Sequence, residues 1–503
     1  MAGVLAGLNG GSVHADPLLN SWFTANTGLY ARVYTSAANR TAGIASTTWS
    51  GQTLPTYAGV HEIDDSPKWV YIRNTGLSSF VMGPWNNPNW PKNQGTSTTV
   101  YRFPRGAAGV TNFSASKTLT GLGAIGFLVD GVAIYNTSDG FSYSASHAQD
   151  ASPIAGIGNG DGIWNRDAWV NEYVSFDYAL NHPQQAGQYH SHADPIATRY
   201  LVGDNVNYNS TAKTYSENTN TTVFQHSPII GWLNDGLPLY GPYGYSNPTN
   251  PASGVRRMIS GYVLRNGNCG TSNLNVSGRT TLPAWAALAQ NRSATLTSGQ
   301  YGPATTYTTG TGPGTTTYTL GHYAEDYDYL GDHGYMQGMT NSDGTFYDLN
   351  QYNVRWCVTP EYPEGTWAYF VAIQSNGAPC YPYNVGRWYF DSPTGGSTSV
   401  AVRNADTPLE QYFKGATNLQ EVLGTPALDP GNGNVALVWS AVEGGTYEVT
   451  TSTNLSNWTT LPATITATNN AATAVEPGDA SANAQRFYRT VRTGVAAFDA
   501  NGY

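Results

Sequence analysis

The stretch AIGFLVDGVAIYN, residues 124–136, contains two runs of β-branched and aromatic residues separated by Asp130 and Gly131. Runs of this kind, interrupted by turn-forming residues, predict strands that are joined in a hairpin. The same rhythm returns along the chain in KWVYIRN (68–74), TVYRFP (99–104), VNEYVSFDY (170–178) and TRYLVGDNVNY (198–208). The stretch LPAWAALAQ, residues 282–290, is the clearest helix. We therefore predict a mostly β chain with many turns.

The composition of the 503-residue chain agrees with this class. Aromatic residues make up 13% of it, including 35 tyrosines and 14 tryptophans, and only 11% of the residues are charged. Aromatic residues favour strands, and the scarcity of charged residues leaves few ion pairs to stabilise helix surfaces. Since single cores stop growing at about 250–300 residues, the chain is long enough for two or more domains.

The distribution of turn residues divides the chain into four segments. Residues 1–54 form an N-terminal extension, 55–400 a large multi-sheet or β-sandwich domain, and 401–433 a linker marked by the Pro/Gly-rich stretch LGTPALDPGNGN (423–434) at its end. Residues 434–497 alternate apolar and polar residues in VALVWSAV, GTYEVTTSTNLSNWTTL and AQRFYRTVRT. This alternation predicts a small β-sandwich of the fibronectin type III kind, acting as a spacer or an adhesion module.

Charge and hydropathy exclude two classes of partner. The formal net charge is −10 and no Lys/Arg-rich run occurs, so the chain lacks the basic surface that nucleic acid requires. No run of about 18 apolar residues occurs, so we expect no transmembrane helix. The low-charge composition, rich in Asn, Thr and Tyr, favours a secreted or cell-surface protein.

The three cysteines, Cys269, Cys357 and Cys380, give an odd count without a CxxC motif, which argues against thiolate zinc sites. Two alternatives stay open. Cys357 and Cys380 lie in strand-like segments that could form a hairpin and a disulfide, or the thiols are buried and free.

Two short motifs match known patterns only in part. GLGAIG (121–126) has the letters of a dinucleotide-binding loop, but a strand-like run follows it where that fold needs a helix. DYDYLGD (326–332) gathers carboxylates without the order of an EF-hand loop, so calcium is a possible ligand there.

Histidines give the strongest chemical signal. In GQYHSHADP (187–195), His190 and His192 are two residues apart, so on a strand both side chains face the same side, about 6–7 Å apart along the backbone. A hairpin or loop brings His182 beside them, and a neighbouring strand brings His226. Converging imidazoles suit copper or zinc, so we predict a metal site. The alternative is a polar network that only rigidifies the fold.

Other residues are candidates for catalysis or binding near such a site. Asp235, in a tight turn, and Glu361, between prolines, are candidate general bases, although carboxylates in turns more often bond their own backbone or face solvent. Trp85, Trp90 and Trp164 near Asn/Gly-rich loops suggest polysaccharide binding, against the alternative of core packing.

GQYHSHADP resembles the signature of the YHYH-domain family, with Ser191 in place of the second tyrosine. Supporting stretches are HSPIIGWLNDGLPLYGPYGY (226–245), YAEDYDYLGD (323–332) and RWCVTPEYPEGTWAYFVAI (355–373). The resemblance spans roughly residues 55–400. It implies a protein of the typically secreted, bacterial kind in which Tyr189, His190 and His192 occupy signature positions.

Two hypotheses about function follow. The first is a secreted protein with a mononuclear histidine-rich copper or zinc site, which acts as a metal-dependent hydrolase or oxidoreductase or only binds the metal. The second is a non-catalytic adhesin or extracellular filament subunit, in which a donated N-terminal strand joins copies into a homo-oligomer. The sequence leaves open whether the protein is an enzyme.

Overall fold

The fold comes from a computed structural model. It describes residues 16–24, 28–53, 55–95, 98–106, 117–152, 155–219, 222–269, 271–306, 308–309, 316–415, 425–440, 446–467, 471–478 and 485–494. Strands dominate, which confirms the mostly β class.

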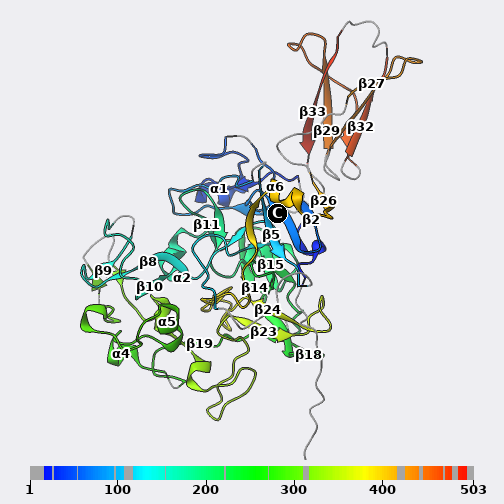
Figure 1. The fold of residues 1–503 in the computed structure, drawn as a ribbon. Helices are drawn as coiled ribbons and strands as arrows, with labels where there is room; N and C mark the ends of the chain where they lie inside the picture. The colour runs from blue at the N-terminus through cyan, green and yellow to red at the C-terminus, as the bar shows by residue number, and fades with distance from the viewer. Residues whose placement is uncertain are drawn as a thin grey trace, which may run out of the picture.

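An eight-stranded mixed sheet is the centre of the large domain (Figure 1). Its order is β11 (Asn181–Pro183), β12 (Tyr189–Ser191), β7 (Ala133–Ile134), β6 (Gly126–Leu128), β15 (Ile229–Leu233), β16 (Pro238–Tyr240), β24 (Thr366–Phe370) and β23 (Val354–Cys357). The pairs β12–β7 and β16–β24 are parallel, and the others are antiparallel. The hairpin predicted for residues 124–136 is the pair β6–β7.

A five-stranded antiparallel sheet faces it. Its order is β25 (Gly396–Ser399), β5 (Thr99–Pro104), β3 (Trp69–Asn74), β2 (Val60–Asp65) and β26 (Glu410–Lys414). One apolar cluster joins residues of both sheets, such as Ile63 and Ile72 from one and Phe127 and Phe370 from the other. The rings of Tyr101 and Phe127 lie 4.1 Å apart across this layer. The large domain is therefore a β-sandwich with additions.

The strands of the larger sheet are buried on both faces. Successive residues of a strand, such as Phe127 and Leu128 or Tyr369 and Phe370, belong to two different apolar clusters, one on each face of the sheet. This alternation follows from the two-residue period of a strand. The other cluster includes α5 (Ala284–Ala289) and aromatic residues of the lobe that carries α4 (Leu274–Ser277), α5, β8 (Ser138–Ser144), β9 (Gln149–Asp150) and β10 (Asn165–Asp167) in Figure 1.

Short strands and helices complete the large domain. The strands are β1 (Arg32–Val33), β4 (Val81–Met82), β8 (Ser138–Ser144), β9 (Gln149–Asp150), β10 (Asn165–Asp167), β13 (Val206–Asn209), β14 (Thr214–Glu217), β17 (Tyr243–Asn247), β18 (Asn250–Arg257), β19 (Tyr262–Leu264), β20 (Thr308–Thr309), β21 (Thr316–Thr317) and β22 (Tyr327–Tyr329). The other helices are α1 (Ala37–Ala42), α2 (Ala168–Glu172), α3 (Ile196–Leu201), α4 (Leu274–Ser277) and α6 (Val400–Ala405), with 3-10 turns η1 (Leu19–Ser21), η3 (Tyr173–Ser175), η4 (Ser298–Gln300), η5 (Ala324–Asp326) and η6 (Leu330–His333).

Two stretches predicted as strands begin instead as helices. VNEYVSFDY runs through α2 and η3, because the side chain of Asp167 caps the helix by accepting a hydrogen bond from Val170 N at 3.1 Å. TRYL of TRYLVGDNVNY lies in α3, which begins directly after Pro195. The helix predicted within 282–290 is confirmed as α5.

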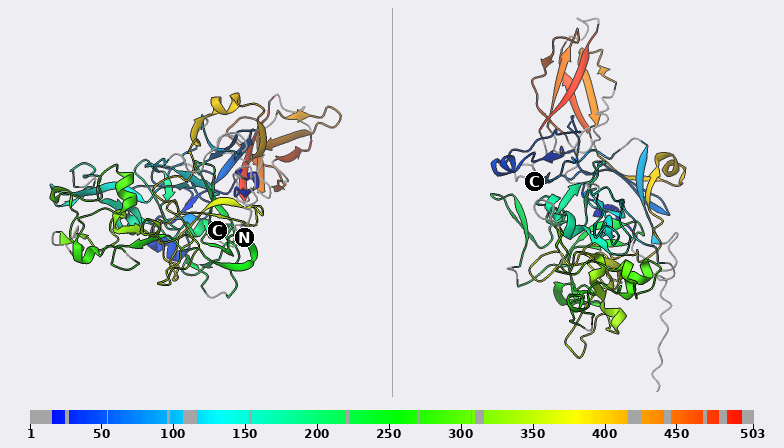
Figure 2. Two further views of the ribbon diagram at one scale, coloured as in Figure 1. Left: turned by 60° about the horizontal axis from the view of Figure 1, so that its bottom comes forward. Right: turned by 90° about the vertical axis from the view of Figure 1, so that its left-hand side faces the viewer.

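The C-terminal module has its own core (Figures 1 and 2). One of its sheets contains β27 (Ala427–Leu428), β28 (Val435–Ser440) and β32 (Ala471–Glu476). The other contains β29 (Thr446–Ser452), β30 (Thr459–Thr460), β31 (Ile465–Thr466) and β33 (Phe487–Gly494). Trp439 and Tyr447 from the two sheets meet with ring centroids 5.8 Å apart. The module is a small β-sandwich, and its likeness to fibronectin type III stays a prediction.

The packing of the two large sheets includes residues from outside 55–400, the segment predicted as the large domain. In the N-terminal extension, Trp22 is buried against Phe103, and Ser21 Oγ accepts a hydrogen bond from Trp232 Nε1 at 2.9 Å. In the predicted linker, β26 pairs with β2. Side chains from both flanking segments therefore help to close the sandwich.

The structure also decides the smaller questions. All three cysteines are free thiols, so the Cys357–Cys380 disulfide is wrong and the alternative of free thiols holds. GLGAIG leads into strand β6, and a Cβ added at Gly126 would lie 2.4 Å from Trp232 O, so this glycine allows close approach of two strands. Within the described residues, no helix is both long and apolar enough to cross a membrane.

Candidate metal centre

Three buried histidines converge at the edge of the eight-stranded sheet. In the antiparallel pair β11–β12, His182 lies directly opposite His190. Their Nε2 atoms are 3.0 Å apart, and the Nε2 atoms of His190 and His192 are 2.9 Å apart. The predicted shared face of His190 and His192 and the predicted hairpin with His182 are confirmed. We call His182, His190 and His192 the histidine triad.

The hydrogen-bond partners of the other ring nitrogens fix the tautomers. Nδ1 of His190 lies 3.0 Å from Gln188 O, and Nδ1 of His192 lies 2.7 Å from Asn136 O. A carbonyl oxygen can only accept, so both Nδ1 atoms carry the hydrogen. Nδ1 of His182 lies 2.7 Å from Ser175 Oγ, whose own hydrogen goes to Glu172 O at 2.7 Å, so this Nδ1 also donates.

The three Nε2 atoms of the neutral rings therefore present lone pairs to one another. The three histidine residues are each at most 3% exposed, and burial lowers the pKa of His182 to about 2 and that of His192 to about 4. Burial and the two neighbouring imidazoles also hold the pKa of His190 well below its usual value. A proton is thus disfavoured between these nitrogens, while a metal cation would neutralise their mutual repulsion.

The distances fit one ion. Imidazole nitrogens bind zinc at about 2.0–2.1 Å, so two ligands of one ion lie at most about 4.2 Å apart. The separations of 3.0 and 2.9 Å meet this limit, and the ligand atoms of all three residues lie within 4.8 Å of one another. Among the described residues, this triad is the one group of three or more His, Cys, Asp or Glu side chains with ligand atoms close enough to hold a metal.

Glu172 adds a carboxylate that sequence reasoning missed. Its Oε2 lies 3.3 Å from His192 Nε2 and 3.7 Å from His182 Nε2. This oxygen is buried and has no hydrogen-bond partner among the described residues. Burial, with smaller contributions from Asp139 and Asp167, raises the pKa of Glu172 to about 8. A buried carboxyl oxygen without a hydrogen-bond partner, set beside three nitrogen lone pairs, is a second sign that a cation fits here.

Aromatic rings enclose the triad. Tyr135 stacks on His190 with centroids 3.8 Å apart, and Phe176 meets His182 edge to face at 4.5 Å. Phe176 also lines a surface hollow of about 440 Å³ together with Trp85 and Tyr178. Phe176 therefore contacts both the triad and this surface hollow.

Buried polar contacts hold the hairpin that carries the triad. Tyr189 donates a hydrogen bond to Asp177 Oδ2 at 2.5 Å, and Asp177 Oδ1 accepts from the backbone nitrogens of Ala179 and Asn181 at the start of β11. The first tyrosine of the signature is thus a structural anchor that keeps His182 opposite His190.

The segment after His192 is anchored as firmly. Arg199, which is fully buried, binds Asp194 Oδ1 at 2.7 Å and Asp204 Oδ2 at 2.7 Å, and it also pairs with Glu217. A buried guanidinium with three carboxylates ties α3 to the segment that carries His190 and His192.

Other predicted site residues lie elsewhere. His226 donates from Nδ1 to Ser227 O at 2.8 Å and packs against Tyr240 and Tyr245, outside the group that could hold a metal. Asp235 accepts hydrogen bonds from Tyr369 Oη at 2.7 Å and from Leu237 N at 3.2 Å in its own turn.

Glu361 accepts a hydrogen bond from Tyr240 Oη at 3.0 Å. Neither Asp235 nor Glu361 forms a hydrogen bond or ion pair with the triad in the described part of the chain. The tertiary structure therefore separates both candidate bases from the candidate metal centre.

The acidic stretch and the tryptophans have structural partners. Asp326 binds Arg279 through two contacts of 2.7 Å, and Asp328 faces Arg265 and His333, so these two carboxylates of the stretch considered for calcium already have side-chain partners. Trp164 is buried, and its Nε1 donates to Gln300 O. Trp85 and Trp90 are half-buried and pack edge to face against each other.

Comparison with known proteins gives one match. A family model described as YHYH protein matches residues 101–382, a span that contains the triad, Glu172 and the anchors of the hairpin. No curated protein and no solved structure matches the chain.

Proposed function

The chain belongs to the YHYH protein family, and we propose that this member binds one divalent transition-metal ion, zinc or copper, through Nε2 of His182, His190 and His192. The observation that carries the proposal is the set of tautomers. All three Nδ1 atoms donate outward, so three nitrogen lone pairs meet in a buried space with no hydrogen between them. A polar network that only rigidified the fold would place donors opposite acceptors.

Glu172 defines the chemistry that the chain could carry out there. A bound zinc or copper ion supplies a Lewis acid that lowers the pKa of water, and copper adds one-electron redox chemistry. Glu172 Oε2 faces the same space as the three Nε2 atoms and is in place to be a fourth ligand or to accept a proton from water. We propose metal-dependent hydrolysis as the reaction class, with Glu172 in the role first considered for Asp235 and Glu361.

Elemental analysis of the purified full chain tests the proposal. We expect about one equivalent of zinc or copper in the parent protein and none in the His190→Ala/His192→Ala variant, with circular dichroism as the check on folding. His226→Ala is the matched control and keeps its metal, because His226 lies outside the triad. A parent protein that holds no metal after loading with Zn²⁺ or Cu²⁺ would overturn the proposal and favour the adhesin or filament hypothesis.

The role of Glu172 is tested separately with Co²⁺ in place of the native metal. Glu172→Gln should still bind one equivalent, because the three imidazoles remain. A change in the visible Co²⁺ spectrum would identify Glu172 as a ligand. An unchanged spectrum with lost hydrolysis of an activated ester would identify it as a proton acceptor, and an unchanged spectrum with unchanged hydrolysis would exclude both roles.

A further inference from the structure

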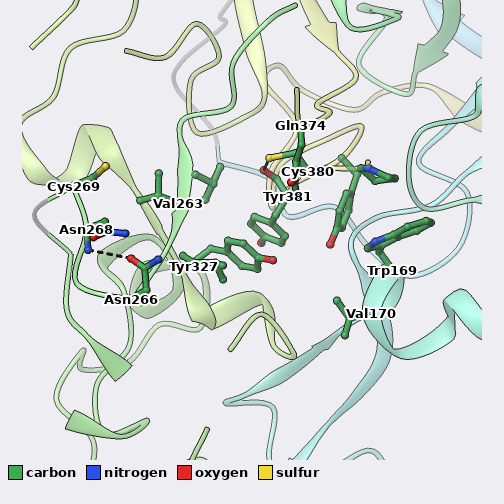
Figure 3. A pocket seen from close by; sticks show the side chains of 14 residues that line it. Trp169, Val170, Val263, Asn266, Asn268, Cys269, Tyr327, Gln374, Cys380 and Tyr381 are labelled. Carbon is green, nitrogen blue, oxygen red and sulfur yellow. Dashed lines mark hydrogen bonds between the residues drawn. The ribbon is translucent and has the colours of Figure 1, made fainter. Parts of the chain in front are cut away.

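A second cavity lies beside the candidate metal centre. It has a volume of about 500 Å³ and is formed by α2, β19, β22 and the loop around residues 374–383 (Figure 3). This volume falls within the range of about 300–1,000 Å³ that is typical of small-molecule sites. Trp169 lines the cavity from α2, and the same helix ends at Glu172.

Aromatic rings make up much of the wall. Tyr327 and Tyr381 lie in the middle of Figure 3, with ring centroids 4.4 Å apart and planes inclined by 8°. Tyr383 stands between Tyr381 at 5.8 Å and Trp169 at 6.4 Å. Tyr381 and Tyr383 are buried, whereas Trp169 and Tyr327 are half-buried, so these two rings are the ones that a ligand in the cavity can reach.

Neutral polar groups complete the wall. The side-chain amides of Asn266, Asn268 and Gln374 line it, and Asn266 Oδ1 accepts a hydrogen bond from Asn268 N at 3.0 Å (Figure 3). The amide of Gln374 and the hydroxyl of Tyr327 form no hydrogen bond with the described residues. Amides and hydroxyls can both donate and accept hydrogen bonds, so donors and acceptors remain available to a ligand.

The cavity wall carries no charge, since none of the described residues that line it is Asp, Glu, Lys, Arg or His. An anionic or cationic ligand would lose its hydration without gaining a counter-charge. The net charge of −10 further disfavours an acidic ligand. The ligand that matches this wall is neutral, has an apolar face for the rings, and carries hydroxyl groups for the amides.

We propose that this cavity binds a neutral sugar unit, such as the end of a neutral oligosaccharide. Pyranose rings combine an apolar C–H face with equatorial hydroxyls, which is the complement of the half-buried rings of Trp169 and Tyr327 flanked by amides. The proposal moves polysaccharide binding away from Trp85, Trp90 and Trp164 to a different part of the fold. It does not depend on a metal at the triad.

The test is calorimetric titration of the full chain with neutral cello-, xylo-, manno- and malto-oligosaccharides, beside oligogalacturonate and phosphocholine. We expect saturable binding of at least one neutral series and none of the two charged probes. Binding should persist in His190→Ala/His192→Ala, which separates this site from the proposed metal centre.

Three variants locate the site. Trp169→Ala should weaken binding about tenfold through the lost aromatic face. Tyr327→Phe, which keeps the ring and removes only the free hydroxyl, should weaken binding about fivefold. Trp85→Ala is the matched control and should bind as the parent does, because Trp85 does not line this cavity. Absence of binding by every neutral series, binding of phosphocholine alone, or affinity unchanged in both Trp169→Ala and Tyr327→Phe would each overturn the proposal.

Discussion

His182 and His190 face each other across the β11–β12 hairpin with Nε2 atoms 3.0 Å apart, and no hydrogen lies between them because both rings donate from Nδ1. Two acceptor lone pairs at this distance repel each other. The backbone pairing enforces the approach, so the fold itself brings these two nitrogens together.

The first prediction concerns Ser175, whose Oγ accepts the hydrogen bond from His182 Nδ1 at 2.7 Å. Ser175→Ala removes the group that orients this ring and fixes its tautomer. Loss of such outer partners weakens metal affinity by about 10–100-fold. Competition with a chromophoric chelator would measure the change. The exposed Ser456 of the C-terminal module supplies a matched Ser→Ala control, and equal affinity of the two variants would contradict the role of Ser175.

The second prediction concerns pH and Asp235. Burial raises the pKa of Asp235 to about 7 in the folded protein, against about 3.9 in an unfolded chain. Between these values the folded state holds a proton that the unfolded state has released, so the contribution of Asp235 to stability is present below pH 4 and is lost as the pH rises toward 7. Asp235→Asn cannot ionise and should lack this loss.

Thermal unfolding at pH 4, 5, 6 and 7 checks the sign. The unfolding free energy of the parent should fall relative to that of Asp235→Asn by about 1–4 kcal/mol over this interval. A difference between the two proteins that stays constant with pH would show that Asp235 keeps the same protonation state in the folded and unfolded chains.

The third prediction uses two glycines of GLGAIG. Gly126→Ala places a Cβ 2.4 Å from Trp232 O and 2.9 Å from Leu233 Cα, so two paired strands must move apart. We expect a loss of about 1–3 kcal/mol or more in the unfolding free energy. Gly121→Ala is the control from the same motif, because nothing lies within 4 Å of the added atom. Urea denaturation of both variants should separate them clearly, and equal midpoints would contradict the strand contact.

The fourth prediction concerns the thiols. Burial raises the pKa of Cys357 to about 12 and that of Cys380 to about 11. At pH 8 only about one thiol in a thousand is then ionised at Cys380, and fewer at Cys357, so both should react slowly with a thiolate-specific reagent in the native protein. Denaturation without reductant should release three reactive thiols, whereas a count of one would reveal a disulfide.

Much of the site was predictable because local periodicity governs it. The i, i+2 spacing of His190 and His192 places both side chains on the same side of any strand. His182 lies eight residues before His190, a separation that is compatible with a hairpin between them. His226 is different. It precedes β15 by three residues, and the order of strands in the sheet, which no local pattern encodes, places it among Tyr240, Tyr245 and Phe370 instead of at the triad.

Glu172 shows how a wrong element hides a site residue. VNEYVSFDY has the β-branched and aromatic content of a strand. A strand prediction for residues 170–178 gives no indication that Glu172 lies near the triad. The available signal was Asp167, whose side chain caps α2 and turns the chain so that Glu172 reaches the Nε2 atoms.

The sequence by itself determined the mostly β class, the β6–β7 hairpin, the small C-terminal sandwich and the shared side of His190 and His192. Strand periodicity and turn residues act over a few positions, so local sequence is enough to predict these features. Only the tertiary structure decided which carboxylate meets the triad, which histidine stays apart, and that the three thiols are free. Those outcomes depend on the order of the strands in the sheet and on how α2 meets the β11–β12 hairpin, which no local pattern encodes.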